Sequence, residues 1–380
     1  MKTQYLTRTP PATDLSNYYT QGQVDAAFAP ITRPRANKLI NGCHRVWQRA
    51  ASYTGITSGS YVGDHWRFYK STSAVFDVTQ ESTSAGDGLP FSRYTQFNTT
   101  TADGFIGTTD YANIVTAVEG ADSTDMMFGM STAKEITLSF WHKHSMVGTF
   151  CVAIRNSATD RYYIANYTQA VTDTWEKAEI TLTADTTGTW LYTRGTIGLQ
   201  LTFSILAGSN FDGTEATWSA GSKVVTSGQV NGANAINYKF CLGGCKLEIG
   251  GEATDYVERP LGEELALARR YYEKSYAYDE YAGDTTYAGG SLFRLTGIAT
   301  AVHDMSIDVR FEEPKAKTPT VVTYSGTSAT ANRAYDFAGA GEIATTLSIQ
   351  SNNGFKWSAT AASASNVNVI CQWTASAEII

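Results

Sequence analysis

Apolar and polar residues alternate with a period of two along most of this chain. The alternation is clearest in residues 135–140, 199–204, 238–242, 245–249, 305–312 and 367–373. Successive side chains of a β-strand point to opposite faces, so this pattern predicts strands with one buried and one solvent-exposed face. No helix-length pattern interrupts them between residues 39 and 260. We therefore predict a β-sandwich of jelly-roll type over residues 39–260.

One segment after this sandwich has a helical pattern. Its apolar positions recur at helical spacing: Leu261, Leu265, Ala268 and Tyr272. Pro260 suits the first helical position, so we predict a helix from Pro260 to about Tyr278, within a linking segment at 261–284. Alternation then returns and predicts a second, smaller β-sandwich over 285–380. The predicted fold class is all-β.

Residues 1–38 form a separate N-terminal segment in this interpretation. Thr20 and Gln23 fit a capping box, and Pro30 would end the helix that they begin. A helix of about nine residues is too short to be stable alone in water. We therefore expect it to anchor the chain by packing against neighbouring copies or a docking protein. The residues expected at this contact are Tyr18, Tyr19, Val24, Ala27 and Phe28.

Composition narrows the class of partner. The net charge of −7 argues against a general nucleic-acid binder, which needs a basic surface. The sequence has no run of 18 apolar residues, so it predicts no membrane-spanning helix. The first residues lead into polar Thr and Pro rather than an apolar core, so we expect no signal peptide and synthesis in a cytoplasm. If the protein ends up outside a cell, a route other than classical secretion takes it there.

Cysteine and histidine suggest two possible sites. Cys241 and Cys245 lie about 13 Å apart in an extended strand, too far for a disulfide unless Gly243-Gly244 makes a sharp turn, so buried free thiols are favoured. His142 and His144 would point to one face of a strand and could form half of a metal site. No third ligand is evident, and exposed polar positions are favoured. We assign no metal and no cofactor.

Several short motifs follow one another in a distinctive order along the chain. The closing motifs are Lys246–Gly250, Ala253–Tyr256, Glu258–Pro260, Gly262–Leu267 and Arg270–Lys274. Earlier motifs are Leu15–Thr20, Asn37–Gly42, Asp64–Trp66, Thr137–Lys143 and Thr174–Lys177, and Trp373–Ile379 comes near the end. Together they resemble phage tail-fibre and receptor-binding proteins with a jelly roll like that of carbohydrate-binding modules.

The resemblance implies a trimeric or otherwise oligomeric appendage of a virion, often one that contacts host-surface glycans. It supplies no catalytic residues and leaves attachment to a tail or a head open. Jelly rolls of this type can hold a structural calcium, but no Asp-rich loop in this chain identifies its ligands.

Aromatic residues provide the candidate glycan contacts, because sugars bind aromatic faces flanked by polar groups. Trp190 and Trp218 lie near Gly/Thr-rich turns, where we expect exposure. Tyr278, Tyr281 and Tyr287 belong to a tyrosine-rich stretch that also contains acidic residues. The favoured alternative is that these tyrosines pack between the two domains or between subunits.

With the resemblance, these observations favour a structural and adhesive fibre protein of a bacteriophage virion that binds a host-surface glycan or another receptor and has no enzymatic activity. One alternative is a purely structural head or collar fibre without a glycan ligand. Another is a polysaccharide depolymerase spike, which predicts a cleft with two carboxyl groups about 5–10 Å apart. The sequence contains neither a Gly-x-Ser-x-Gly elbow nor a phosphate-binding loop with Lys.

Overall fold

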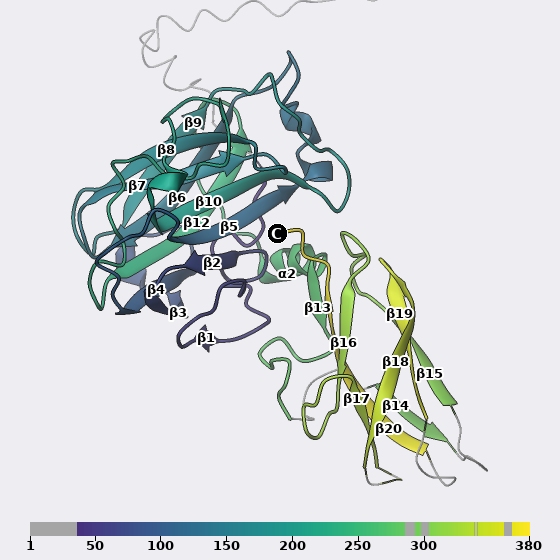
Figure 1. The fold of residues 1–380 in the computed structure, drawn as a ribbon. Helices are drawn as coiled ribbons and strands as arrows, with labels where there is room; N and C mark the ends of the chain where they lie inside the picture. The colour runs from purple at the N-terminus through teal and green to yellow at the C-terminus, as the bar shows by residue number, and fades with distance from the viewer. Residues whose placement is uncertain (1–35, 286–292, 298–303, 338, 340, 361–366) are drawn as a thin grey trace, which may run out of the picture.

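The computed structural model describes residues 36–285, 293–297, 304–337, 339, 341–360 and 367–380 (Figure 1). These residues form two antiparallel β units joined by one short helix, which confirms the predicted all-β class. The predicted N-terminal helix and its contact residues Tyr18, Tyr19, Val24, Ala27 and Phe28 lie outside the described residues. None of the helices in the described ranges is long and apolar enough to span a membrane.

The first unit is a sandwich of two six-stranded antiparallel sheets. One sheet has the order β1 (Ser52–Tyr53), β3 (Val75–Ser82), β4 (Arg93–Thr101), β12 (Lys239–Ile249), β6 (Ile136–His144) and β9 (Glu176–Leu182). The other has the order β11 (Ser219–Ala220), β8 (Arg161–Gln169), β7 (Gly148–Arg155), β10 (Ile197–Ala207), β5 (Tyr111–Glu119) and β2 (Arg67–Ser71). Strands distant in sequence, such as β4 and β12, are neighbours, as expected for a jelly roll.

Aromatic side chains from the inner faces of both sheets fill the core of this sandwich. Phe140 of one sheet meets Phe203 of the other edge to face, with ring centroids 5.0 Å apart. Short 3-10 helices occupy the connections: η2 (Ala85–Asp87), η3 (Gly120–Asp122), η4 (Thr124–Met126) and η5 (Ser209–Phe211). Asn37 and Lys38 bond to β12, so the sandwich begins before the predicted boundary at residue 39.

Strand β12 contains a bulge at the two glycines between its cysteines. Its pairing with β6 shifts register between Gly243 and Lys246. Gly244 has a φ of 59°, and a Cβ at this position would lie 2.6 Å from the Phe91 ring, so the bulge requires glycine. Cys241 and Cys245 are buried free thiols, as predicted, and burial raises the pKa of Cys241 to about 12.

The linking helix is shorter than predicted. Helix α2 spans Leu261–Arg269, and the chain then forms strand β13 (Tyr272–Lys274) instead of continuing to Tyr278. Tyr271 and Tyr272 are both buried, and β13 pairs with β20, about a hundred residues later in the chain. The helical spacing of Tyr272 was therefore misleading, because a distant strand outweighs the local pattern.

The second unit is an eight-stranded sheet that curls around its own core. Its strands are β13, β14 (Phe293–Gly297), β15 (Asp304–Arg310), β16 (Thr320–Tyr324), β17 (Arg333–Asp336), β18 (Gly341–Ser351), β19 (Gly354–Thr360) and β20 (Val367–Ser376). Strand β20 pairs with β13, β14, β16 and β17 and so forms the centre of this unit. Trp357 and Trp373 are buried in the core.

Candidate functional site

A groove of about 330 Å³ lies on the outer face of the sheet that contains β2, β5, β7 and β10. Residues that face the core alternate with residues that line the groove: Ile114 and Leu201 belong to the core, whereas Asn113 and Gln200 line the groove. The lining side chains from strands are Tyr69, Tyr111, Asn113, Val115, Arg155 and Gln200. Those from connections are Thr159, Phe211 and Val224.

A long connection after β10 forms one wall of this groove. Residues of this connection cover the outer face of β7 and β8, where Val224 and Val225 pack with Ile164. The remaining outer face of β2, β5 and β10 stays open beside it. The connection therefore turns a flat sheet face into a groove.

The base of this wall is fixed by a close backbone contact. The N–H of Gly208 donates to the Asp110 carbonyl at 2.8 Å, and a Cβ on Gly208 would lie 2.0 Å from the Gly107 carbonyl oxygen. Only glycine fits there. The contact holds η5 against β5, and the Phe211 and Tyr111 rings meet nearly at right angles with centroids 5.5 Å apart.

Three half-buried aromatic rings give the groove its apolar surface: Tyr69, Tyr111 and Phe211. The register places Asn113 directly opposite Tyr69 on the neighbouring strand, so a polar side chain lies beside an aromatic one. Aromatic faces beside a few fixed polar groups are the usual composition of a sugar-binding site.

Two polar groups that line the groove lack a full set of partners. Oδ1 of Asn113 is buried, the whole residue being 8% exposed, and has no hydrogen-bond partner in the part of the chain that the structure describes. Nε of Arg155 is buried and equally unpaired within those residues. Buried polar atoms without partners are rare in folded proteins, so each requires a reason, such as a water molecule or ligand.

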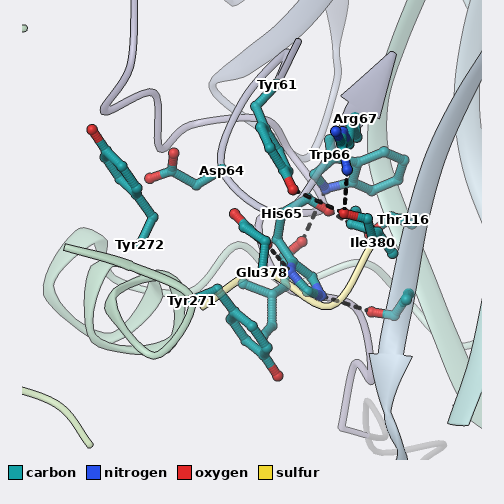
Figure 2. Close-up of polar contacts among 12 residues, drawn as sticks. Tyr61, Asp64, His65, Trp66, Arg67, Thr116, Tyr271, Tyr272, Glu378 and Ile380 are labelled. Atoms are coloured by element: carbon teal, nitrogen blue, oxygen red, sulfur yellow. Dashed lines mark hydrogen bonds and ion pairs between the residues drawn. The ribbon is translucent and has the colours of Figure 1, made fainter. Parts of the chain in front are cut away.

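A second polar cluster lies at the junction of the two β units (Figure 2), and its acidic residues and histidine are buried. His65 is buried and bridges the units: its Nε2 lies 3.0 Å from the Ala117 carbonyl and its Nδ1 lies 3.0 Å from Oε2 of Glu378. Arg49 donates to Glu378 at 2.8 Å and to Asp64 at 2.9 Å. Its guanidinium lies between the rings of Tyr61 and Tyr272, 4.1 and 3.8 Å from their centroids.

Glu119 forms a similar centre in the same junction. Its carboxylate accepts two hydrogen bonds from Arg270, at 2.7 and 2.8 Å, and one each from the Tyr271 hydroxyl and the Gly195 N–H. Burial favours the neutral acid, but these hydrogen bonds outweigh it and lower the pKa of Glu119. The charges of this junction are paired, so we assign it to holding the two units together rather than to binding.

Trp190 and Trp218 do not line the groove. Trp190 is 8% exposed, and its Nε1 donates to the Thr187 carbonyl, so the predicted exposure of Trp190 is wrong. Trp218 is half-buried and packs edge to face on Trp190 with centroids 5.4 Å apart. The rings cap the end of the core beside Phe128, which explains why a turn-like sequence did not place them on the surface.

The tyrosine-rich stretch lies at the junction. Tyr278 is 36% exposed, and its hydroxyl donates to the Arg45 carbonyl at 2.9 Å. Tyr281 is half-buried beside the Lys274 ammonium group. Tyr271, Tyr272 and Tyr276 of this stretch are buried, which agrees with the favoured alternative of packing between the domains. Tyr287 lies outside the described residues.

The two strand histidines are buried, so the favoured prediction of exposed polar positions is wrong. His144 lies between Phe150 and Phe240, with ring centroids 3.6 and 4.5 Å away. His142 contacts Oε1 of Gln169 at 3.0 Å. Among the described residues, no group of three His, Cys, Asp or Glu side chains could hold a metal ion. Strand β6 is covered on this face by the other sheet, which alternation alone does not reveal.

None of the groove residues was predicted from the sequence as a binding residue. Each of three groove residues occupies an outward position of its strand, where a polar or partly polar side chain is expected: Tyr69, Tyr111 and Arg155. The one available signal was the type of residue: aromatic and amide side chains occupy outward positions where solvent-exposed strands usually carry charged or small polar residues. Only the sheet order brings these positions together.

Comparison with known proteins adds distant similarities. No protein-family model matches the sequence, and no curated protein matches it. The enzymatically active domain of tailspike protein 4 from bacteriophage CBA120 is similar over 56% of this chain and 21% of that domain, with 10% identity and a TM-score of 0.31. This chain thus matches about a fifth of that domain's length.

Carbohydrate-binding modules are also among the similar solved structures. The CBM22-1 xylan-binding domain of Paenibacillus barcinonensis Xyn10C is 12% identical over 58% of this chain and 98% of that one, with a TM-score of 0.26. The family 11 module of Clostridium thermocellum, in complex with a mixed-linked tetrasaccharide, is 14% identical over 54% and 99%, with a TM-score of 0.26. Similarities at these TM-scores carry no information about function.

Proposed function

We propose that this chain is a glycan-binding protein and that its groove on β2, β5 and β10 is the binding site. The observation that carries the proposal is the combination of three half-buried aromatic rings with incompletely paired polar groups in one groove. A sugar supplies what this groove lacks: C–H faces for the rings, and hydroxyl groups that can donate to an amide oxygen and accept from a guanidinium group.

We further propose that the protein is a fibre component of a bacteriophage virion, in agreement with the order of sequence motifs. In this proposal residues 1–35 carry the anchoring and trimerising function, since Asn37 and Lys38 already belong to the sandwich. Several copies on one particle would convert weak single contacts into firm attachment through effective concentration.

The proposal assigns binding rather than hydrolysis to the groove. Glycosidases use a pair of carboxyl groups, and the groove lining contains none. A hollow beside the junction is lined by Glu119, Asp122 and Asp125, but Glu119 is held by Arg270 and Tyr271, and Asp125 pairs with Lys38 at 2.6 Å. The depolymerase alternative therefore has weaker support than glycan binding.

A glycan array probed with the wild-type protein and Tyr111→Ala tests the proposal. We expect the wild type to bind a subset of glycans and Tyr111→Ala to lose at least about tenfold in affinity, roughly 1.4 kcal/mol, because one stacking ring is removed. Tyr94→Ala is the matched control, since Tyr94 is a half-buried strand tyrosine of the other sheet. Equal binding by all three proteins would contradict the assignment to this groove, and release of reducing ends from bound glycans would favour the depolymerase.

A further inference from the structure

The charge of the groove is unusual for this protein. The chain carries a net charge of −7, yet Arg155 is the one charged side chain among the groove-lining residues, and no carboxylate accompanies it there. Three other buried or half-buried guanidinium groups are paired with acids: Arg49 with Asp64 and Glu378, Arg161 with Asp185, and Arg270 with Glu119.

Neutral oxygens are the partners that the structure gives Arg155. Nη2 donates to Oε1 of Gln200 at 2.8 Å and to Oγ1 of Thr202 at 3.2 Å, and Nη1 donates to Oγ of the exposed Ser222 at 3.3 Å. Nε has no partner among the described residues. Burial lowers the pKa of the Arg155 guanidinium to about 10, so the group remains charged at neutral pH.

A largely buried cation without an anionic partner is costly, and binding an anion would relieve that cost. Arginine is well suited to this role, because its planar guanidinium matches the two oxygens of a carboxylate. Gln200 and Thr202 accept from Nη2, and one Nη1 hydrogen, beside the exposed Ser222 hydroxyl, is left to donate to an oxygen of the anion.

We propose that the groove selects glycans that carry a carboxylate, such as uronic or sialic acid residues, and that Arg155 is the specificity-determining residue. This inference rests on the proposed glycan-binding function. The tyrosine rings of the groove would contact the sugar ring, and Arg155, one strand beyond Gln200, would bind its carboxylate.

The test compares acidic oligosaccharides with their neutral counterparts. The probes are oligogalacturonate, hyaluronan oligosaccharides and α-2,8-linked oligosialic acid, each paired with its carboxyl-reduced form, titrated by calorimetry against the full chain. We expect at least one acidic probe to bind ten times or more tightly than its reduced form. This preference should weaken as salt concentration rises, because it is electrostatic.

Three arginine variants test whether the charge of Arg155, and not a change in folding, determines the preference for acidic probes. Arg155→Gln should abolish the preference and lower affinity for the acidic form to that of the reduced form, whereas Arg155→Lys should retain part of the preference. Arg93→Gln, at an exposed arginine of the other sheet, should change nothing. Circular dichroism and thermal unfolding verify that each variant is folded.

Two results would overturn the inference in distinguishable ways. Binding of neutral forms as tight as acidic forms, sensitive to Tyr111→Ala but not to Arg155→Gln, would reject acid selection and leave the glycan-binding groove in place. Binding of neither form, on these probes and on the glycan array, would reject the proposed function together with the inference.

Discussion

At the scale of single residues, some buried polar groups of the sandwich have all their hydrogen-bond partners within the protein, and others do not. Glu119 receives four hydrogen bonds, whereas Asn113 and Arg155 in the groove have polar atoms without partners among the described residues. Such atoms also occur in the core, at His144 Nε2 for example, so an unpaired atom indicates a binding site only where it lines a groove, as Asn113 and Arg155 do.

Buried histidines make the stability of the sandwich depend on pH. Burial lowers the pKa of His44 from 6.5 to about 3 and that of His142 to about 4, and it also lowers the pKa of His144. The unfolded chain then binds more protons in acid than the folded chain does. The stability contribution is complete above pH 6.5 and decreases as pH falls from 6.5 through 4.

Thermal unfolding between pH 7.5 and 4 measures this effect. Each titrating histidine should contribute about 1.4 kcal/mol per pH unit below 6.5. His144→Phe keeps a ring between Phe150 and Phe240 and should reduce the slope by about one histidine's share. A slope unchanged by this variant would contradict the account of His144 as a buried neutral side chain.

At the scale of elements, the groove exists because a connection packs closely against a sheet. One of these contacts joins Gly208 to Gly107, with no room for a side chain between them. Gly208→Ala should therefore displace η5, lower stability by about 1–3 kcal/mol and weaken glycan binding, since Phe211 and Tyr111 would separate.

The control for this prediction is Gly228→Ala. A Cβ at Gly228 would meet no atom closer than 3.9 Å, so this variant should retain stability and binding. Chemical denaturation and the glycan titration measure both quantities. A Gly208→Ala protein with normal binding would show that the wall of the groove does not depend on this contact.

The strands also show how much of the fold could be predicted from the sequence. Alternation located strands such as β6, β10 and β12 and the all-β class, because burial on one face imposes a period of two. It could not identify which strands become neighbours, so the groove stayed hidden and Tyr272 was assigned to a helix. Burial of Trp190 and His144 depends on packing across the sandwich, which no local pattern records.

At the scale of the whole molecule, the two β units are joined by paired charges as well as by α2. The last residues of the chain lie between the units (Figure 1), and Glu378 binds Arg49 and His65 of the jelly roll there. Although burial opposes it, attraction to Arg49 and His65 lowers the pKa of Glu378 below its ordinary value of 4.5. Its contribution to stability is present above pH 4.5 and is lost as pH falls through the lowered pKa.

Glu378→Gln should weaken the junction, since it leaves Arg49 with one fewer anionic partner. Removing one member of a buried ion pair typically costs about 3–5 kcal/mol. We expect a lower melting temperature and a larger radius of gyration in X-ray scattering, as the units separate. Glu312→Gln is the control, because Glu312 pairs with Arg269 at the exposed surface, and it should cost less than about 1 kcal/mol. Identical scattering from both variants would contradict a charge-held junction.

A crystal structure with an array-selected oligosaccharide would show whether the groove on β2, β5 and β10 binds sugar. We expect a sugar ring against Tyr69, Tyr111 or Phe211, with a polar group of the ligand near Asn113 or Arg155. A sugar bound instead at the Trp190 and Trp218 cluster, or at the junction, with the groove empty, would contradict the account.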